Sequence, residues 1–168
     1  KEDELDVKAG LETISASSQD LIRFVESYRN FTEVAPPIRK AVMVDELLDR
    51  VLRLNKAKMA EQGAVLTYQD KMADLLIYAD EGQIVQVFNN LIKNAVQAGA
   101  TSIRITADLN AEDQTVIRVS NNGKAIPLRQ IDEIFVPFYT TKSNGTGIGL
   151  SLSKQIMVKH NGSLDRKS

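Results

Sequence analysis

The segment "GQIVQVFNNLIKNAVQAG" (residues 82–99) carries two different stripes on one predicted helix. At 100° per residue, its apolar side chains share one face, and a row of uncharged amides lies within about 40° of a second line. A solvated face more usually recruits lysine and glutamate, which form helices better than asparagine does. The amides therefore indicate either hydrogen bonds to a neighbouring strand or loop, or ligation of a hard cation such as Mg²⁺. The amides are Gln83, Gln86, Asn90, Asn94 and Gln97, and the apolar residues are Ile84, Val87, Phe88, Leu91 and Ala95.

The chain is long enough to give this helix a core, since 168 residues with 43% hydrophobic content predict one folded domain and an extra element. With 21 basic and 22 acidic residues the net charge is −1, which gives no reason to expect nucleic acid or an anionic membrane as the partner. The lack of cysteine excludes disulfides and thiolate nucleophiles and is compatible with a reducing compartment. No apolar run approaches the ~20 residues of a spanning helix. We therefore expect a cytoplasmic chain with no membrane segment.

The first 35 residues predict a long helix with a heptad seam. Such a stripe needs a partner helix or a second subunit to cover it, or it lies on the core of its own domain. Pro36 and Pro37 end the helix, because proline supplies no N–H and disfavours the α region before it. We place a boundary there, with a helical element over 1–35 and a domain over 38–168. The seam consists of Val7, Leu11, Ile14, Ser18, Leu21, Val25 and Tyr28.

Helices and strands are intermixed in the rest of the chain. A helix starts near Asp45 as its cap and stops at Gly63, two short strands follow, and Asp80 opens the amide helix. Residues 102–109 and 115–120 alternate as the two strands of a hairpin, and a last helix covers 148–160. The predicted fold is an α/β (α+β) two-layer sandwich, a mixed sheet with helices on one face. Ile103, Ile105, Ile117 and Val119 should point inward, and Arg104 and Arg118 outward.

The loop "TTKSNGTGIGL" (residues 140–150) joins a lysine and three alternating glycines to this last helix. Glycine allows a close approach of the backbone, so such a loop can present N–H groups to an anion at a helix N-terminus. The signal is weak alone, because the spacing matches neither the P-loop nor the dinucleotide-binding template. Its meaning depends on the rest of the chain.

Four segments together resemble, in order and spacing, the nucleotide-binding boxes of bacterial sensor histidine kinases. They are "NNLIKNAVQA" (89–98), "VSNNGKAIP" (119–127), "IDEIFVPFYTTK" (131–142) and "GTGIGL" (145–150). The resemblance covers about residues 38 to 165. It implies the fold shared with gyrase-type topoisomerases, mismatch-repair ATPases and ninety-kilodalton heat-shock chaperones, in which ATP lies between helices and a mobile lid.

The resemblance also implies roles for single residues. Asn94 matches the asparagine that ligates Mg²⁺ on the ATP phosphates, Lys142 reaches the phosphates, and Phe135 and Phe138 pin the base of the lid. Asn90 stands where the chaperone and topoisomerase relatives carry the glutamate that activates water, which disfavours an ATP hydrolase of that class. The positions matching nucleotide-binding residues are Asn90, Asn94, Gln97, Asn121, Gly123, Ala125, Ile126, Thr141, Lys142, Gly145, Thr146, Gly147, Ile148, Gly149 and Leu150.

The first glycine box departs from the family pattern at two positions. Asn121 replaces the aspartate that accepts from the adenine amine, which exchanges a charge-assisted hydrogen bond for a neutral one, a difference of order 1 kcal/mol. Ala125 replaces the second glycine and adds a methyl group near the base. These changes leave open the alternative of a degenerate nucleotide-binding signalling module without kinase activity.

The resemblance places the phosphoacceptor histidine outside this chain. The single histidine, His160, lacks the adjacent acid of that motif, and we expect it to contact helix-end carbonyls or solvent. The N-terminal helix resembles the second helix of the family's dimerisation and phosphotransfer hairpin, and the last strand of the domain is expected to be missing. The implied partners are ATP with Mg²⁺, a second copy of the chain and a response-regulator receiver domain. The chain alone should not phosphorylate itself, and a parent anchored in the inner membrane is compatible with this reading.

Overall fold

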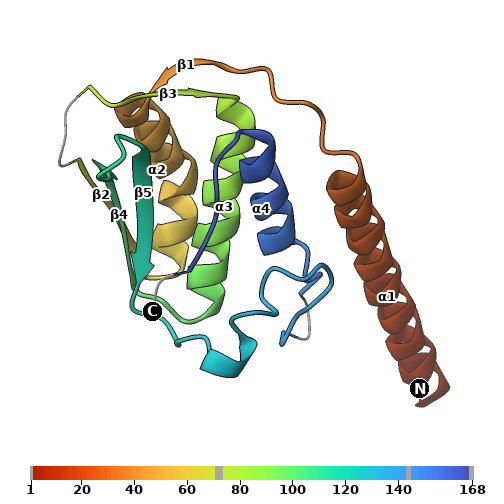
Figure 1. Cartoon of the computed structure of the whole chain (residues 1–168). Coiled ribbons are helices and arrows are strands. Elements are labelled where there is room, and N and C mark those ends of the chain that lie inside the picture. The colour runs from red at the N-terminus through yellow and green to blue at the C-terminus, as the bar shows by residue number, and fades with distance from the viewer. Residues whose placement is uncertain (1, 71–73, 143–144, 167–168) are drawn as a thin grey trace.

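The computed structural model describes residues 2–70, 74–142 and 145–166, and Figure 1 shows its elements. In chain order they are α1 (Glu2–Thr32), β1 (Lys40–Met43), α2 (Val44–Glu61), β2 (Val65–Asp70), β3 (Leu76–Ala79), α3 (Glu81–Gln97), β4 (Ser102–Leu109), β5 (Thr115–Asn121), a 3₁₀ turn (Leu128–Gln130) and α4 (Gly149–Lys159).

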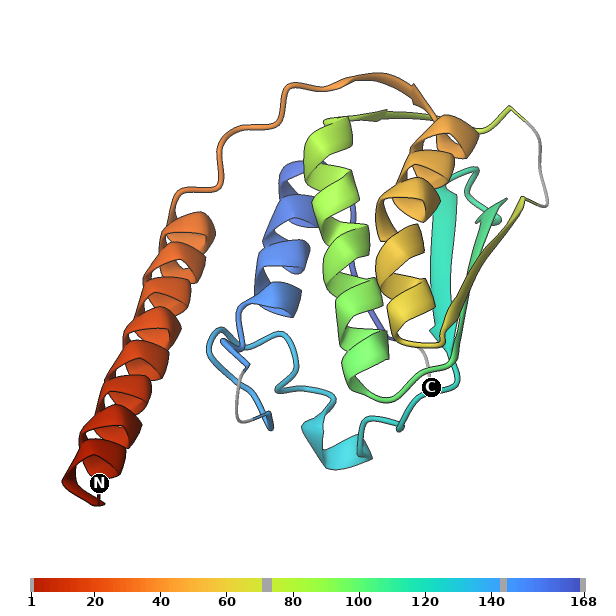
Figure 2. The same cartoon turned by 180° about the vertical axis from the view of Figure 1, so that it is seen from behind.

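The main sheet has the strand order β2-β4-β5. Its central strand β4 runs parallel to β2 and antiparallel to β5, so the sheet is mixed. A separate pair, β1 and β3, is antiparallel. The helices α2, α3 and α4 lie together on one side of the main sheet, as Figures 1 and 2 show. The predicted two-layer arrangement is confirmed.

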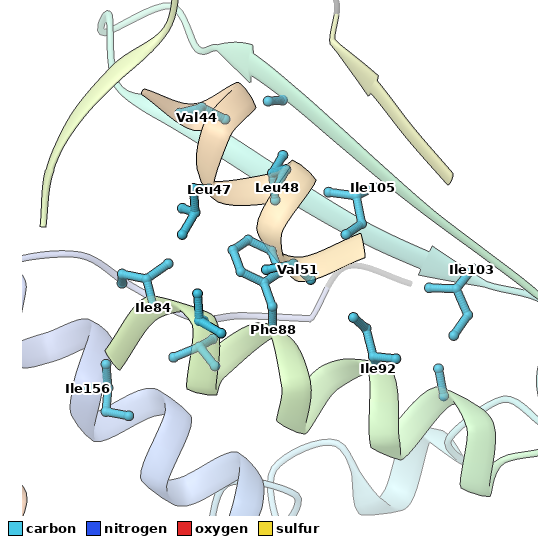
Figure 3. Packing of buried hydrophobic residues seen from close by; sticks show 14 of the residues in the cluster. Val44, Leu47, Leu48, Val51, Ile84, Phe88, Ile92, Ile103, Ile105 and Ile156 are labelled. Carbon is cyan, nitrogen blue, oxygen red and sulfur yellow. The ribbon is translucent and has the colours of Figure 1, made fainter. Parts of the chain in front are cut away.

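The core fills the space between β4 and the helices. Strand β4 alternates strictly, and its inward residues Ile103 and Ile105 are fully buried. In Figure 3, Phe88 of α3 lies beside Val51 of α2, so the two helices pack through their apolar faces. Ile117 and Val119 of β5 are partly buried against the same core. The apolar face of the amide helix is therefore the one that covers the sheet.

Two local expectations differ from the structure. Strand β1 was not predicted, because four residues are too short to show a periodicity. Because β1 leads directly into α2, Met43 is the N-cap and Asp45 lies in the first turn, where its carboxylate accepts from the Tyr68 hydroxyl at 2.7 Å. The predicted Asp45 cap is wrong. The Asp80 cap of α3 is confirmed, since its carboxylate accepts from the Gln83 N–H at 3.1 Å.

Helix α1 ends at Thr32, before the two prolines, and runs away from the domain in Figures 1 and 2. The seam residues Leu11 and Ile14 are 62% and 64% exposed, whereas Phe31 and Val34 at the C-terminal end pack against the core. The C-terminal part of the helix therefore lies on its own domain. None of the helices in the described part of the chain is both long and apolar enough for a membrane crossing.

The linker after α1 is held by hydrogen bonds from α3 and α4. The Gln83 side chain donates to the Ala35 carbonyl at 3.0 Å, and the Ile38 N–H donates to the Asp80 carboxylate at 3.0 Å. The Lys159 ammonium donates to the Val34 carbonyl. The start of α3 and the end of α4 together fix where α1 leaves the domain.

Candidate functional site

Most of the amide side chains of α3 contact other parts of the chain. Besides Gln83, which binds the linker, Asn89 accepts from the Asn55 side chain of α2 at 2.8 Å. Asn90 binds α4, and the last two amides, Asn94 and Gln97, accept from Lys142 in the loop before α4, residues 135–148, here called the lid. The unusual amide stripe of the sequence is thus a set of contacts that ties α3 to its surroundings.

Asn90 joins α3 to the first turns of α4. Its side-chain NH₂ donates to the Gly149 carbonyl and to the Ser153 hydroxyl, both at 3.2 Å. The Ser153 hydroxyl donates in turn to the Gly149 carbonyl at 2.8 Å. Asn90 therefore positions the start of α4 next to α3 and offers no carboxylate that could act as a base.

Lys142 reaches from the lid to the C-terminal end of α3. Its ammonium donates to the Gln97 side-chain oxygen at 2.7 Å and lies 3.3 Å from the Asn94 side-chain oxygen. Partial burial, and second the nearby charge of Lys93, hold the pKa of Lys142 below its usual value. The lid lysine and the two amides, far apart in sequence, form one polar cluster.

The frame of the lid depends on two glycines. The Phe138 N–H donates to the Gly147 carbonyl at 3.0 Å, which closes the loop at its base. Gly147 has φ +65°, and a Cβ there would overlap the Phe138 carbonyl carbon. At Gly145 a Cβ would overlap the hydroxyl of Thr140, which itself accepts from the Lys142 N–H at 3.1 Å. A side chain at Gly147 would clash with backbone, whereas one at Gly145 would require the Thr140 hydroxyl to move.

Phe138 at the lid base also packs on α1. Its ring lies 5.7, 6.2 and 6.4 Å, between centroids, from the rings of Phe24, Tyr28 and Phe31. The second phenylalanine of the box, Phe135, instead receives the Lys154 ammonium 4.9 Å above its ring. The two rings therefore attach the lid to two different helices, Phe138 to α1 and Phe135 to α4.

The lid leads into the N-terminus of α4. The Ile148 side chain is 2% exposed and belongs to the core, so only its backbone can face a ligand. No side chain among the described residues caps this end of the helix. The first backbone N–H groups of α4 therefore have no partner within the helix and carry the positive end of the helix dipole.

The end of β5 closes the site on the other side of α3. The Lys124 N–H donates to the Ala98 carbonyl at 2.8 Å, which ties this turn to the end of α3. Asn121 is exposed, and its side-chain oxygen accepts from the Gly123 N–H at 3.0 Å. A Cβ at Gly123 would lie 3.0 Å from the Ala98 carbonyl oxygen, so glycine permits this close approach.

The structure thus brings together Asn90, Asn94, Gln97, Lys142 and Gly149. The Gly145 N–H, which donates to the Lys142 carbonyl at 3.2 Å, adds a further predicted site residue to this group. Within the described residues, no hydrogen bond joins the group to Thr141, Thr146, Ala125 or Ile126. Ser143 and Asn144, within the glycine loop, lie outside the described residues. Two residues of the network, Asn55 and Ser153, were not predicted from the sequence. Both are polar and buried, and such residues usually mark a hydrogen bond.

His160 has a structural place at the end of α4. Its Nδ1 lies 2.8 Å from the Ile156 carbonyl oxygen, and its Nε2 accepts from the Asp80 N–H at 3.0 Å. A neutral ring with the proton on Nδ1 satisfies both contacts. The expected contact with a helix-end carbonyl is confirmed, and the ring ties the end of α4 to the start of α3.

Residues 79–168 match the family described as histidine kinase-, DNA gyrase B- and HSP90-like ATPases, which is more than half of the chain. The chain belongs to this family. Among its ATPase relatives, the sensor histidine kinase ZraS of Salmonella typhi is 28% identical over 159 residues, 94% of this chain and 34% of ZraS. The sensor protein FixL of Bradyrhizobium diazoefficiens is 30% identical over 161 residues, 93% of this chain and 32% of FixL. The chain therefore spans about a third of the length of these relatives.

Solved structures of histidine kinases share the fold of this ATPase domain. The nucleotide-free catalytic domain of histidine kinase ThkA superposes with a TM-score of 0.65 at 32% identity, over 73% of this chain and 81% of that domain. ThkA in complex with the response regulator TrrA superposes with a TM-score of 0.73 at 26% identity, over 93% of this chain and 45% of ThkA. The suspected resemblance to a histidine kinase ATPase domain is confirmed.

Proposed function

We propose that this domain binds ATP with Mg²⁺ beside the C-terminal half of α3, between the lid and the first turn of α4. The observation that carries the proposal is the approach of Lys142 to Asn94 and Gln97. A lid cation and an amide row separated by more than forty residues converge on one point, next to a helix N-terminus that is open to an anion.

Each element of the site has one task in this proposal. Lys142 and the backbone N–H groups of Gly149 and Leu150 bind the phosphates, because they supply positive charge and donors to an anion. Gly145 and Gly147 let the lid backbone approach them. Asn121 accepts from the adenine amine with the lone pair that Gly123 does not use, and Ala125 and Ile126 lie along the base. Asn90 positions α4.

The residues present fit Mg²⁺ through one protein oxygen. The side-chain oxygen of Asn94 already lies 3.3 Å from a cation, the Lys142 ammonium. Among the residues that the structure describes, no group of three histidine, cysteine, aspartate or glutamate side chains could hold a metal. Magnesium commonly keeps several waters and takes its remaining ligands from the phosphates of the substrate, so a single amide oxygen is a sufficient contribution. When bound, the metal neutralises phosphate charge.

The chain's own residues then favour transfer of the γ-phosphoryl group over its hydrolysis. The donors of Lys142 and α4 orient the triphosphate and stabilise its charge. Asn90, whose amide is occupied by Gly149 and Ser153, leaves no carboxylate next to the phosphates to deprotonate water. The acceptor in this proposal is a histidine outside this chain, and the phosphoryl group passes from it to an aspartate of a response-regulator receiver domain.

The exposed seam of α1 supports a further part of the proposal. Val7, Leu11, Ile14 and Leu21 are each more than half exposed, and a heptad stripe of this kind buries itself by pairing with other helices. We place α1 as the second helix of a dimerisation and phosphotransfer hairpin in a homodimeric, cytoplasmic kinase region. The chain alone then binds nucleotide but does not phosphorylate itself.

Calorimetric titration of the whole chain with Mg²⁺·ATP, ADP and GTP tests the proposal. We expect saturable binding of the adenine nucleotides, and Asn94→Ala should weaken binding of Mg²⁺·ATP by about tenfold or more, as loss of a ligand in a metal site does. Gln86→Ala is the matched control. Gln86 belongs to the same amide stripe of α3, precedes Asn94 and Gln97 along the helix, and is exposed. Equal affinities of the wild type and Asn94→Ala for Mg²⁺·ATP would refute the metal site. Absence of any adenine-nucleotide binding at millimolar concentration would refute the function.

A further inference from the structure

The Lys142 ammonium contacts the Asn94 side-chain oxygen that the proposed function assigns to the metal. Its ammonium lies within reach of both amide oxygens at the end of α3, 2.7 Å from Gln97 and 3.3 Å from Asn94. A magnesium ion and the ammonium on the same Asn94 oxygen would lie only a few ångströms apart and would repel each other in a partly buried site. One of them has to leave before the other can bind.

We propose that Lys142 is an internal substitute for the metal. In the nucleotide-free chain, Gln97 holds the Lys142 ammonium on the Asn94 oxygen, and Mg²⁺·nucleotide must displace this ammonium. This inference rests on the proposed function and assigns Gln97 a role that differs from binding the nucleotide. Gln97 makes the shorter of the two bonds to the ammonium and therefore holds Lys142 back from the phosphates.

The geometry of the lid allows this exchange without a large movement. The backbone of Lys142 is fixed by its N–H bond to the Thr140 hydroxyl and by the Gly145 N–H bond to its carbonyl at 3.2 Å. The lysine side chain has a flexible four-carbon stem, so the ammonium can swing from the amides to a phosphate while the backbone stays in place. The positive charge of Lys93 nearby favours the move toward an anion.

The hydrogen-bond acceptors of the Lys142 ammonium also explain why it can leave Asn94. Both acceptors of the ammonium are neutral amides, whose hydrogen bonds to a charged donor are worth less than a salt bridge with a buried carboxylate. A triphosphate offers full negative charges to the same ammonium. The lysine therefore gains by moving when a nucleotide arrives, and Asn94 becomes free for the metal.

The sign of the effect of Gln97→Ala separates this role from a direct contact with ATP. If Gln97 only holds Lys142 back, its removal leaves Asn94 and Lys142 intact and makes Mg²⁺·ATP bind about two- to fivefold more tightly in calorimetric titration of the whole chain. If Gln97 binds the nucleotide, the same variant binds it more weakly. Gln97 is the last residue of α3 and is exposed, so alanine there leaves the fold intact.

A double-mutant cycle with Lys142→Met completes the test. The inference requires that Gln97→Ala has no further effect on the affinity once Lys142 is replaced, since nothing is then left to hold back. Gln86→Ala, an amide of the same helix without a lysine partner, should change nothing in either background. An unchanged or weaker affinity of Gln97→Ala, or the same gain in the Lys142→Met background, would overturn the inference.

The outcome also distinguishes this inference from the proposed function. If Mg²⁺·ATP binds and Asn94→Ala abolishes its magnesium dependence, the function stands, and only the effect of Gln97→Ala decides the role of Lys142. If the wild type binds no adenine nucleotide, the function fails and the substitute role of the lysine fails with it.

Discussion

The helices α1 and α3 each carry one apolar stripe, but the two stripes differ in burial. In α3 the apolar face is buried against the sheet, and amides around the rest of the helix reach the linker, α2, α4 and the lid. In α1 the apolar seam stays exposed over most of its length, and the contacts described between α1 and the domain lie in the C-terminal part of the helix. A helix at the centre of a site, such as α3, has partners for its polar side chains as well as for its apolar face. A helix that pairs with another subunit, as proposed for α1, has an apolar stripe that its own domain does not cover.

The largest expected effect tests the buried face of α3. Phe88 is 5% exposed and fills the space beside Val51, so Phe88→Ala leaves a cavity and should lower the free energy of unfolding by about 3–5 kcal/mol. Urea denaturation followed by circular dichroism measures it. A loss below about 1 kcal/mol would mean that α3 is not the central helix of the core.

The next effect tests the amide contacts of α3. Asn55 is buried and donates to the Asn89 side chain and to the Val51 carbonyl. Asn55→Ala leaves the Asn89 side-chain oxygen without this donor and should cost about 1–3 kcal/mol in the same denaturation experiment. Lys56→Ala, at the exposed neighbouring position, is the control and should change stability by less than about 0.5 kcal/mol. Equal effects of the two variants would show that the amide network does not stabilise the helix.

A smaller effect concerns the start of α3 and depends on pH. Burial tends to raise the pKa of Asp80, but the N–H groups of Ile38, Gln83 and Gly82 outweigh it and lower the pKa below 3.8. The folded state thus favours the carboxylate, and the resulting stabilisation is present above pH 3.8 and disappears as the pH falls through the lowered pKa. Asp80→Ala should cost about 1 kcal/mol at pH 7, as loss of an N-cap does.

Denaturation at several pH values checks this prediction. The difference between the wild type and Asp80→Ala should shrink at acid pH, because protonation removes the advantage of the carboxylate. Asp80→Asn keeps an acceptor at the N-cap and should retain most of the stability at pH 7. A difference that grows toward acid pH has the wrong sign and would contradict the hydrogen bonds described for this carboxylate.

The smallest effect is expected in α1. Leu11 is 62% exposed, so Leu11→Ala should change the free energy of unfolding of the dilute chain by less than about 0.5 kcal/mol. Analytical ultracentrifugation shows whether the chain is monomeric under those conditions. A loss above about 1 kcal/mol that increases with protein concentration would show that the seam is already paired with another copy of the chain. The apolar stripes of α1 and α3 would then both be buried, and the two helices would differ only in what covers the stripe.

Long periodic elements and the order of the motifs were predictable from the sequence. The amide helix, its Asp80 cap and the hairpin that contributes Ile103 and Ile105 appear where the pattern indicates, because a period of 3.6 or 2 over many residues is a strong signal. Strand β1 has no such signal, and its presence moved the start of α2 away from Asp45. Likewise, the polar stripe of α3 indicated that its amides had partners, but gave no information on which amide binds which neighbour.

The sequence by itself determined the family, the class of fold and the chemical types that meet at the site, since these follow from local periodicity and from motifs within single segments. Only the tertiary structure decided that Lys142 rests on Asn94 and Gln97, that Asn90 holds α4 and that Phe138 lies on α1. The physical reason is that each of these contacts joins residues far apart in the chain. Their distances depend on how the helices pack on the sheet, and no local pattern records that packing.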